Sequence, residues 1–244
     1  MRIFVTGGAG YLGSEVCRQA VDAGHDVVAT RFGKEPPFGG AVDLDVREPF
    51  DVDADVVIHT AYVMGDADTI VHGTRNVAAA AERAGSRLVH LSTDLVFDGE
   101  HAPYTEDDEA RPVSAYGRAK LEAEGLVHGL VVRTSLLYGK PGPQEALAAR
   151  LGATFYTDEI RCPIRVDDLA AALLELAATD LTGILHVAGP DAVSRYDFAV
   201  LLGARDPKGA PAPPGRARNV ALDSSRAAAL LSTKIRGIQG LLHS

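Results

Sequence analysis

Residues 2–20 read "RIFVTGGAGYLGSEVCRQA", and this stretch decides the expected fold. A short strand-like run leads directly into Gly7, Gly10 and Gly13, which open a segment of helical character. Glycines in such a turn let the backbone approach a pyrophosphate, and the start of the helix offers N–H groups and a positive dipole end. The stretch therefore predicts dinucleotide binding, although its G-x-x-G-x-x-G spacing departs from the commoner G-x-G-x-x-G. The alternative is a tight structural turn.

The rest of the chain alternates short apolar runs with longer helix-like segments. The expected strands cover 2–6, 26–30, 55–60, 87–92 and 130–134, and the expected helices cover 11–23, 69–84 and 115–127. Strands rich in Val, Ile and Leu, separated by helices, are typical of βαβ units. We therefore predict an α/β protein with a Rossmann-type, doubly wound parallel sheet. The Pro/Gly-rich run at 206–218 predicts an exposed loop.

The composition excludes several classes of protein. The 244 residues carry a formal net charge of −9, so we expect neither nucleic acid nor an anionic membrane surface as a partner. Two cysteines are too few for a disulfide framework, and no His/Cys/Asp cluster has metal-ligand spacing. No leader pattern and no apolar run of membrane-spanning length occur. These observations predict a cytoplasmic protein without a metal site.

The residues that end the second expected strand bear on the choice of cofactor. An NAD-binding fold usually has Asp or Glu about 20 residues after the glycine turn, where it holds the ribose 2′-hydroxyl. This chain has Thr30 and Arg31 there. An arginine attracts a 2′-phosphate, and the sequence shows no carboxylate at this point to repel it. We therefore expect NADP(H) to be favoured. NAD(H) is the alternative if Arg31 is only a solvated loop residue.

A tyrosine and a lysine four residues apart begin the third expected helix, in "YGRAKLEAE" at 116–124. Residues at this spacing share a helix face, so Tyr116 and Lys120 are expected to point the same way. Spacing alone favours an ordinary half-buried tyrosine beside a solvated lysine. The other motifs of the chain change that interpretation.

Together with the glycine turn, "LVHLSTDLVFDG" at 88–99 and "YGRAKLEAE" resemble motifs of the short-chain dehydrogenase/reductase superfamily. The chain looks most like the nucleotide-sugar group typified by dTDP-4-dehydrorhamnose reductase. Weaker likenesses continue in "RTSLLYG" at 133–139 and "RCPIRVDDLA" at 161–170. The resemblance implies a dinucleotide-binding core over 1–140. Over 141–244 it implies mostly a small substrate-binding lobe, interleaved with late core elements.

The resemblance also implies roles for particular residues. Tyr116 would exchange a proton with the substrate oxygen, and Lys120 would favour its phenolate and hold the nicotinamide ribose. Thr93 would hydrogen-bond the reacting carbonyl. His59 is expected to be a packed, hydrogen-bonded residue and not a catalyst. The expected cofactor-binding residues are Gly7, Gly10, Tyr11, Leu12, Gly13, Arg31, Asp45, Val46, Thr60, Ala61, Tyr62 and Lys120.

The function implied by this likeness is an NADPH-dependent reductase of a 4-keto nucleotide-sugar. Two alternatives stay open: an NAD-dependent nucleotide-sugar epimerase or dehydratase, and a non-catalytic regulatory NAD(P)-binding protein. The regulatory alternative is favoured by Ile70, which stands where relatives carry a proton-relay asparagine. Asn76 is a poor substitute for that asparagine. Homodimers are common in the group. The candidate partners of a substrate diphosphate are Arg161, Arg165, Arg216 and Arg218.

Overall fold

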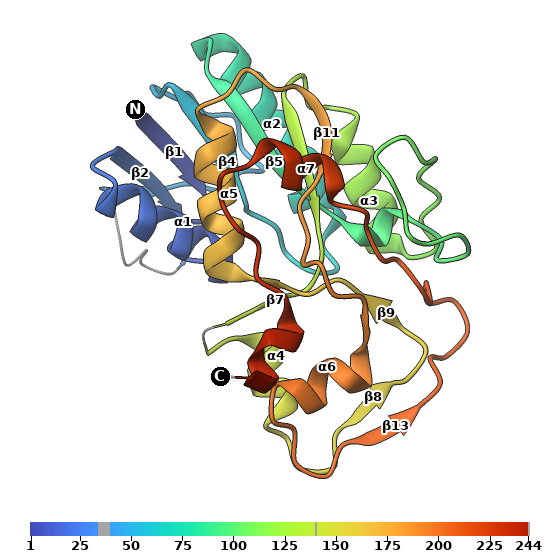
Figure 1. Ribbon diagram of the computed structural model, residues 1–244. Helices are drawn as coiled ribbons and strands as arrows, with labels where there is room; N and C mark the ends of the chain where they lie inside the picture. Colours follow the sequence, from blue (N-terminus) through green and yellow to red (C-terminus); the bar gives the residue numbers. More distant parts are fainter. Residues whose placement is uncertain (34–39, 140, 244) are drawn as a thin grey trace. The chain divides into compact units, whose positions relative to one another are not determined.

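A computed structural model describes residues 1–33, 40–139 and 141–243 of the chain (Figure 1). Across these residues a central sheet has the strand order β11-β6-β5-β4-β1-β2-β3. β1 pairs in parallel with β2 and β4, β2 pairs with β3, and β4 pairs with β5. The strands are β1 (Arg2–Thr6), β2 (Asp26–Arg31), β3 (Gly40–Asp43), β4 (Val56–His59), β5 (Arg87–Thr93), β6 (Leu130–Thr134) and β11 (Gly183–His186). Because the order reverses at β1, the sheet is doubly wound, which confirms the predicted α/β Rossmann-type class.

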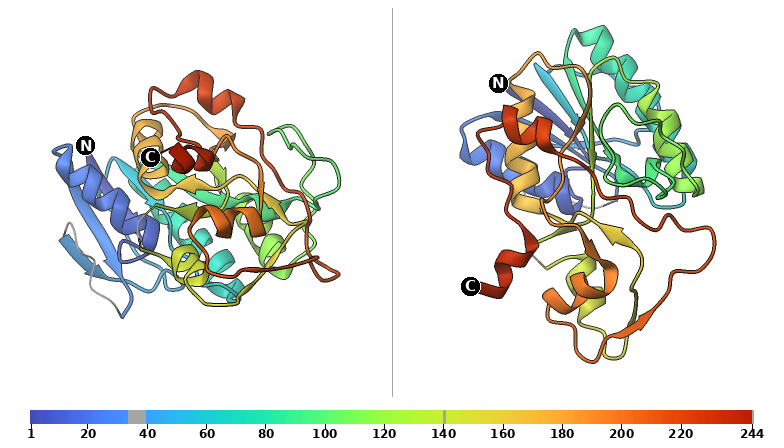
Figure 2. Two further views of the ribbon diagram at one scale, coloured as in Figure 1. Left: turned by 60° about the horizontal axis from the view of Figure 1, so that its bottom comes forward. Right: turned by 45° about the vertical axis from the view of Figure 1, so that its right-hand side comes forward.

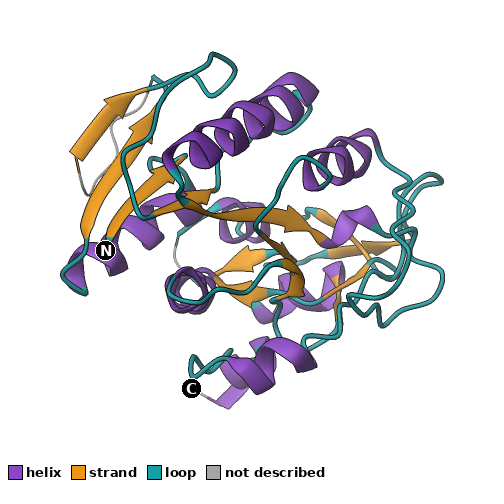
Figure 3. Ribbon diagram, turned by 90° about the horizontal axis from the view of Figure 1, so that it is seen from above, coloured by secondary structure: helices purple, strands orange, loops and turns teal. Residues whose placement is uncertain are grey.

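Helices cover both faces of this sheet, as Figure 3 shows. The longer ones are α1 (Tyr11–Asp22), α2 (Ala67–Ala84), α3 (Ala115–Glu124) and α5 (Val166–Ala177). The Asp66 side chain caps α2 by accepting a hydrogen bond from the Thr69 amide at 3.1 Å, and Gly85, at φ 64°, ends the helix in the left-handed region. Across the described residues, no helix combines the length and apolar character needed to cross a membrane.

The apolar core explains why the expected strands form. Val77 of α2 packs with Phe4, Val57 and Leu88, which come from β1, β4 and β5. The five predicted strands match β1, β2, β4, β5 and β6 to within one residue at each end. The three predicted helices match α1, α2 and α3 to within three residues. Strand β3 was not predicted, because its four residues have no long apolar run.

Short elements make up much of the remaining chain. The strands are β7 (Leu137–Tyr138), β8 (Thr154–Tyr156), β9 (Ile160–Arg161), β10 (Ile164–Arg165), β12 (Val193–Ser194) and β13 (Lys208–Ala210), and the helices are α4 (Pro143–Ala148), α6 (Arg195–Leu201), α7 (Ser225–Leu230), η1 (Asp94–Val96) and η2 (Ile238–His243). β7 pairs with β10, β9 with β12, and β8 with β13. The expectation of a loop over 206–218 is therefore wrong at β13. Both views of Figure 2 show α4 and α6 side by side, and the two helices pack together.

The described chain divides into two compact units. The first comprises Met1–Ser92, Arg118–Val132 and Ala170–Ile184, and the second comprises Thr93–Gly117, Arg133–Leu169 and Leu185–Ser244. Helix α3 begins in the second unit and continues in the first. The division at residue 140 into a cofactor core and a substrate lobe stays a prediction.

Candidate active site

The glycine turn between β1 and α1 lies directly against the end of β4. Gly7 has φ 70°, a conformation that glycine adopts without strain, and a Cβ there would lie 2.9 Å from the backbone N of Ala61. A Cβ on Gly13 would lie 2.2 Å from the carbonyl oxygen of Gly7 and 2.8 Å from the Thr60 hydroxyl. Both glycines are therefore required by close packing of the turn on itself and on the segment after β4. A glycine turn of this kind, between a strand and a helix, fits the pyrophosphate of a dinucleotide.

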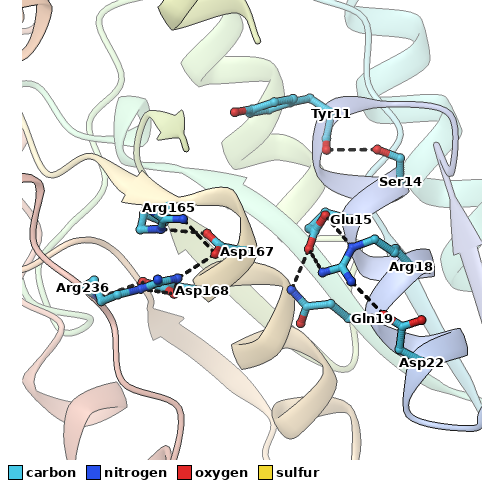
Figure 4. Close-up of polar contacts among 10 residues, drawn as sticks. All are labelled: Tyr11, Ser14, Glu15, Arg18, Gln19, Asp22, Arg165, Asp167, Asp168 and Arg236. Carbon is cyan, nitrogen blue, oxygen red and sulfur yellow. Dashed lines mark hydrogen bonds and ion pairs between the residues drawn. The ribbon is translucent and has the colours of Figure 1, made fainter. Parts of the chain in front are cut away.

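The start of α1 has the charge distribution that an anion requires. Its N-cap, Gly10, has no side-chain cap, and the first turn with Tyr11 and Leu12 contains no acidic residue. The first carboxylate of the helix is Glu15, which is buried and accepts from Gln19 at 2.9 Å (Figure 4). The positive end of the helix dipole therefore faces the glycine turn. No carboxylate in the first turn of α1 offsets this positive end.

Arg31 is paired with a carboxylate, which corrects one premise of the cofactor prediction. The strand register places Arg31 of β2 opposite Asp43 of β3. Arg31 donates from Nε to Oδ1 at 2.6 Å and from Nη2 to Oδ2 at 2.9 Å. This fork lowers the pKa of Asp43 by hydrogen bonding and charge. The sequence concealed the carboxylate because Asp43 lies twelve residues along the chain and meets Arg31 only through strand pairing.

The segment after β3 is held to helix α2. The Asn76 side chain donates to the carbonyls of Val46 at 3.0 Å and Arg47 at 2.7 Å. Val46 is buried, and a Cβ on Gly73 of α2 would lie 2.8 Å from its methyl group. Asp45 forms an ion pair with Arg47, with Nη2 and Oδ2 2.6 Å apart. Asn76 therefore holds the expected adenine-edge segment to α2.

A directed hydrogen-bond chain crosses the carboxyl ends of β1 and β4. Thr74 donates its hydroxyl to the Ile70 carbonyl at 2.6 Å, so it accepts from Nε2 of His59 at 3.1 Å. Nδ1 of His59 is then the acceptor for the Thr6 hydroxyl at 2.6 Å, and Thr6 accepts from the Ala61 amide at 3.3 Å. Burial, followed by the nearby Lys120 charge, lowers the pKa of His59 to about 3. These contacts confirm His59 as a packed, neutral residue.

Lys120 is buried, in contrast to an ordinary helix lysine. It is 5% exposed, and its Nζ donates to the Leu91 carbonyl at 2.5 Å. The ammonium lies 5.8 Å from the ring centroid of Tyr62, which follows β4. Burial lowers the pKa of Lys120 to about 8, partly opposed by the charge of Glu124. A buried lysine with a lowered pKa is a candidate functional group, because such shifts are common in active sites.

The two expected hydroxyl groups belong to the second unit. Thr93 ends β5 and is buried, and its hydroxyl donates to Oδ1 of Asp94 at 3.2 Å and accepts from the Leu95 amide at 3.2 Å. Tyr116 is half-buried in the first turn of α3. A Cβ on the next residue, Gly117, would lie 2.1 Å from the Leu95 carbonyl oxygen, so the start of α3 packs directly on the turn that follows Thr93.

The four candidate diphosphate arginines all have carboxylate partners. Arg161 pairs with Asp94, Arg165 with Asp167, Arg216 with Glu159 and Arg218 with Asp158. Figure 4 shows Asp167 bound by both Arg165 and Arg236. Arg161 is only 4% exposed and its guanidinium is already paired with Asp94, so a contact with a substrate diphosphate stays a prediction. Across residues 1–33, 40–139 and 141–243, no group of three or more His, Cys, Asp or Glu side chains could hold a metal ion.

A doubly wound sheet with a bare glycine turn, followed by a tyrosine and a lysine four residues apart on α3, defines a dinucleotide-binding protein of the short-chain dehydrogenase/reductase type. The model of the RmlD substrate binding domain family matches residues 1–238. The chain belongs to this family.

Named relatives agree with this assignment. The chain is 35% identical to a probable low-salt glycan biosynthesis reductase, Agl14, of Haloferax volcanii, over 81% of this chain and 78% of the relative. It is 34% identical to dTDP-4-dehydrorhamnose reductase of Mycobacterium tuberculosis, over 81% of this chain and 73% of the relative. The crystal structure of a hypothetical dTDP-4-dehydrorhamnose reductase from Sulfolobus tokodaii has a TM-score of 0.86 and 28% identity, covering 98% of this chain and 99% of the other.

Proposed function

We propose that this chain is an NADPH-dependent reductase of a 4-keto nucleotide-sugar, with Tyr116 as the proton donor. The observation that carries the proposal is Lys120, which is buried with a pKa of about 8 one helical turn after Tyr116 on α3. The family supports the reaction class, an NAD(P)-dependent reduction of a nucleotide-sugar ketone. A protein that only binds the cofactor has no need of the complete set of Thr93, Tyr116 and Lys120.

The chain's residues divide the work of the reduction. Bare backbone at Gly7 and Gly13 and the start of α1 would hold the pyrophosphate of the cofactor, which supplies the hydride when bound. Thr93 would hydrogen-bond the ketone oxygen and stabilise the charge that develops there. Tyr116 would then protonate this oxygen. A free phenol has a pKa of about 10, and the ammonium of Lys120 would stabilise the phenolate left behind.

Purified protein mixed with NADPH or NADH and a series of 4-keto nucleotide-sugars, including dTDP-4-dehydrorhamnose, tests the proposal. We expect the nicotinamide absorbance band to decay with at least one sugar and to stay constant without sugar. Measurable binding of NADPH, with no oxidation by any sugar in the series, would contradict a reductase and favour a regulatory protein. Tightly retained oxidised cofactor with sugar isomerisation would favour an epimerase.

Substitutions in the Arg31–Asp43 ion pair are expected to change the preference for NADPH over NADH. In Arg31→Ala, the 2′-phosphate loses its cation while the Asp43 carboxylate remains, so we expect the ratio of NADPH to NADH efficiency (kcat/KM) to fall roughly tenfold. In Asp43→Asn the repelling carboxylate is removed while Arg31 keeps its charge, so the same ratio should rise. Arg83→Ala, which breaks an exposed pair with Asp51 elsewhere in this unit, is the control. An unchanged ratio in Arg31→Ala would remove Arg31 from cofactor selection.

Two further expectations belong to the proposal. A homodimer is the expected assembly, and sedimentation of the purified protein at several concentrations tests it. A reducing, cytoplasmic compartment is supported by Cys17 and Cys162, which are both buried free thiols. Burial raises the pKa of Cys17 to about 12 and that of Cys162 to about 11, so neither thiol is activated.

A further inference from the structure

A buried carboxylate stands directly beside the expected carbonyl-binding hydroxyl. The side chain of Asp94 has no exposed surface, and both of its oxygens are hydrogen-bonded. Oδ1 accepts from the Thr93 hydroxyl at 3.2 Å, and Oδ2 accepts from the Ser135 hydroxyl at 2.5 Å. Ser135 in turn accepts from the Cys162 amide at 3.2 Å. Asp94 therefore links the end of β5 to the segments after β6 and β9.

This carboxylate forms an ion pair with the buried guanidinium of Arg161. Arg161 donates from Nε to Oδ2 of Asp94 at 2.7 Å and from Nη2 to Oδ1. Its Nη1 lies 3.5 Å from Glu159, which is itself buried and paired with Arg216 at 2.7 Å. The charge of Arg195 also interacts with the charges of Asp94, Glu159 and the two arginines. Burying so many charges costs several kcal/mol per ion, and such pairs are seldom the most stabilising choice for a core. A specific role for the pair is therefore worth seeking.

The geometry gives the pair a direct effect on Thr93. While its hydroxyl donates to Asp94, the Thr93 oxygen keeps a fixed direction, since it also accepts from the Leu95 amide at 3.2 Å. To stabilise a ketone oxygen, the same hydroxyl must turn its proton from Asp94 toward the substrate. An unbalanced carboxylate would hold this proton strongly, whereas a carboxylate already engaged by Arg161 competes weakly for it.

We propose that Asp94 and Arg161 are positioning residues for the reduction: Asp94 orients the Thr93 hydroxyl, and Arg161 balances the carboxylate so that the hydroxyl can transfer its hydrogen bond to the ketone. This inference rests on the proposed function and assigns to it two residues that act through Thr93. The turn after Thr93 also packs against Gly117, the residue that follows Tyr116, because a Cβ there would lie 2.1 Å from the Leu95 carbonyl oxygen.

Three variants separate this role from simple support of the fold. Arg161→Gln leaves the carboxylate unbalanced, so we expect kcat to fall at least tenfold with little change in KM. In Asp94→Asn/Arg161→Gln, a neutral acceptor still faces Thr93, and kcat should recover to within about fivefold of the wild type. In Asp94→Ala/Arg161→Met, no acceptor remains, and kcat should fall to the level of Thr93→Val. Thermal unfolding of each variant identifies those that fold. If Arg161→Gln does not fold, the comparison of the two double variants with each other still tests the inference.

Coupling to Thr93 is the decisive readout. In a Thr93→Val background the Asp94→Ala/Arg161→Met change should lower kcat by less than about threefold, since residues that act through one another are not additive. Equal losses in both backgrounds, or an Asn/Gln pair as slow as the Ala/Met pair, would overturn the inference and leave the reductase intact.

A measurement without substrate keeps the inference separate from the function. Three-bond couplings of the Thr93 methyl, in protein labelled at threonine, report its side-chain rotamer. We expect one rotamer in the wild type and the Asn/Gln pair, and averaging in the Ala/Met pair. A fixed rotamer in the Ala/Met pair would refute positioning by Asp94 even if the wild type reduces a sugar. Absence of turnover in the wild type, with averaging as expected, would refute the proposed function alone.

Discussion

Tyr116→Phe is expected to lower kcat about a thousandfold while cofactor affinity stays within about twofold. The change removes one oxygen and with it the proton donor, and general acid–base groups contribute roughly 10²–10⁴ to rate. The ring is half-buried at the start of α3, and phenylalanine keeps its packing. Single-turnover oxidation of NADPH in the presence of sugar measures the effect on the chemical step.

The matched control for this experiment is Tyr196→Phe. Tyr196 is also a half-buried tyrosine in the first turn of a helix, α6, and its loss should leave kcat unchanged. If Tyr116→Phe turned over as fast as Tyr196→Phe, another residue would be the acid. If Tyr116→Phe instead lost cofactor binding, the tyrosine would belong to the cofactor site and its role in proton transfer would need a new argument.

Lys120→Met is expected to abolish most turnover and at the same time to stabilise the cofactor-free protein. Lowering the lysine pKa from 10.5 to about 8 by burial corresponds to a cost of about 3 kcal/mol at neutral pH. Methionine fills similar space without charge but leaves the Leu91 carbonyl without its ammonium donor, which costs about 1 kcal/mol. We therefore expect the free energy of unfolding to rise by about 2 kcal/mol at pH 7, while kcat falls at least a hundredfold.

The pH dependence fixes the origin of this gain. Below the folded pKa of about 8 the lysine is charged in both states, and its full burial cost is present. As the pH rises toward the unfolded pKa of about 10.5, the unfolded chain binds more protons than the folded one, so the wild type gains stability. The advantage of Lys120→Met in urea unfolding should therefore shrink between pH 8 and pH 10.

Lys208→Met, which changes an exposed lysine on β13, provides the control and should show no comparable gain at any of these values. A gain for Lys120→Met that does not change with pH would mean that packing, and not charge, is responsible.

The sheet could be predicted from the sequence because its signal is local. The strands from Arg2 to Thr6 and from Leu130 to Thr134 are short apolar runs, and each is buried over almost its whole length. β3 and β13 could not be found in this way. Each has three or four residues of small or polar character, and each exists because a neighbouring strand, β2 or β8, supplies hydrogen-bond partners.

The residues of the candidate site also differ in whether their signal is local in the sequence. Gly7, Gly13 and the Tyr116–Lys120 spacing could be read from the sequence, since each is a pattern within a few residues. Asp43 and Asp94 could not be read as partners of distant arginines. Their roles depend on strand register and on a contact across 67 positions of the chain, and an isolated aspartate in a sequence carries no sign of either.

The hydrogen-bond chain through His59 also limits how protons move in this unit. At one end stands a peptide N–H, which can only give, and at the other a peptide carbonyl, which can only receive. If any hydrogen bond between these ends reversed its direction, the amide or the carbonyl would lose its partner. Protons therefore cannot be passed along this chain. The imidazole of His59, in one tautomer, connects β1 to α2 through its hydrogen bonds with Thr6 and Thr74.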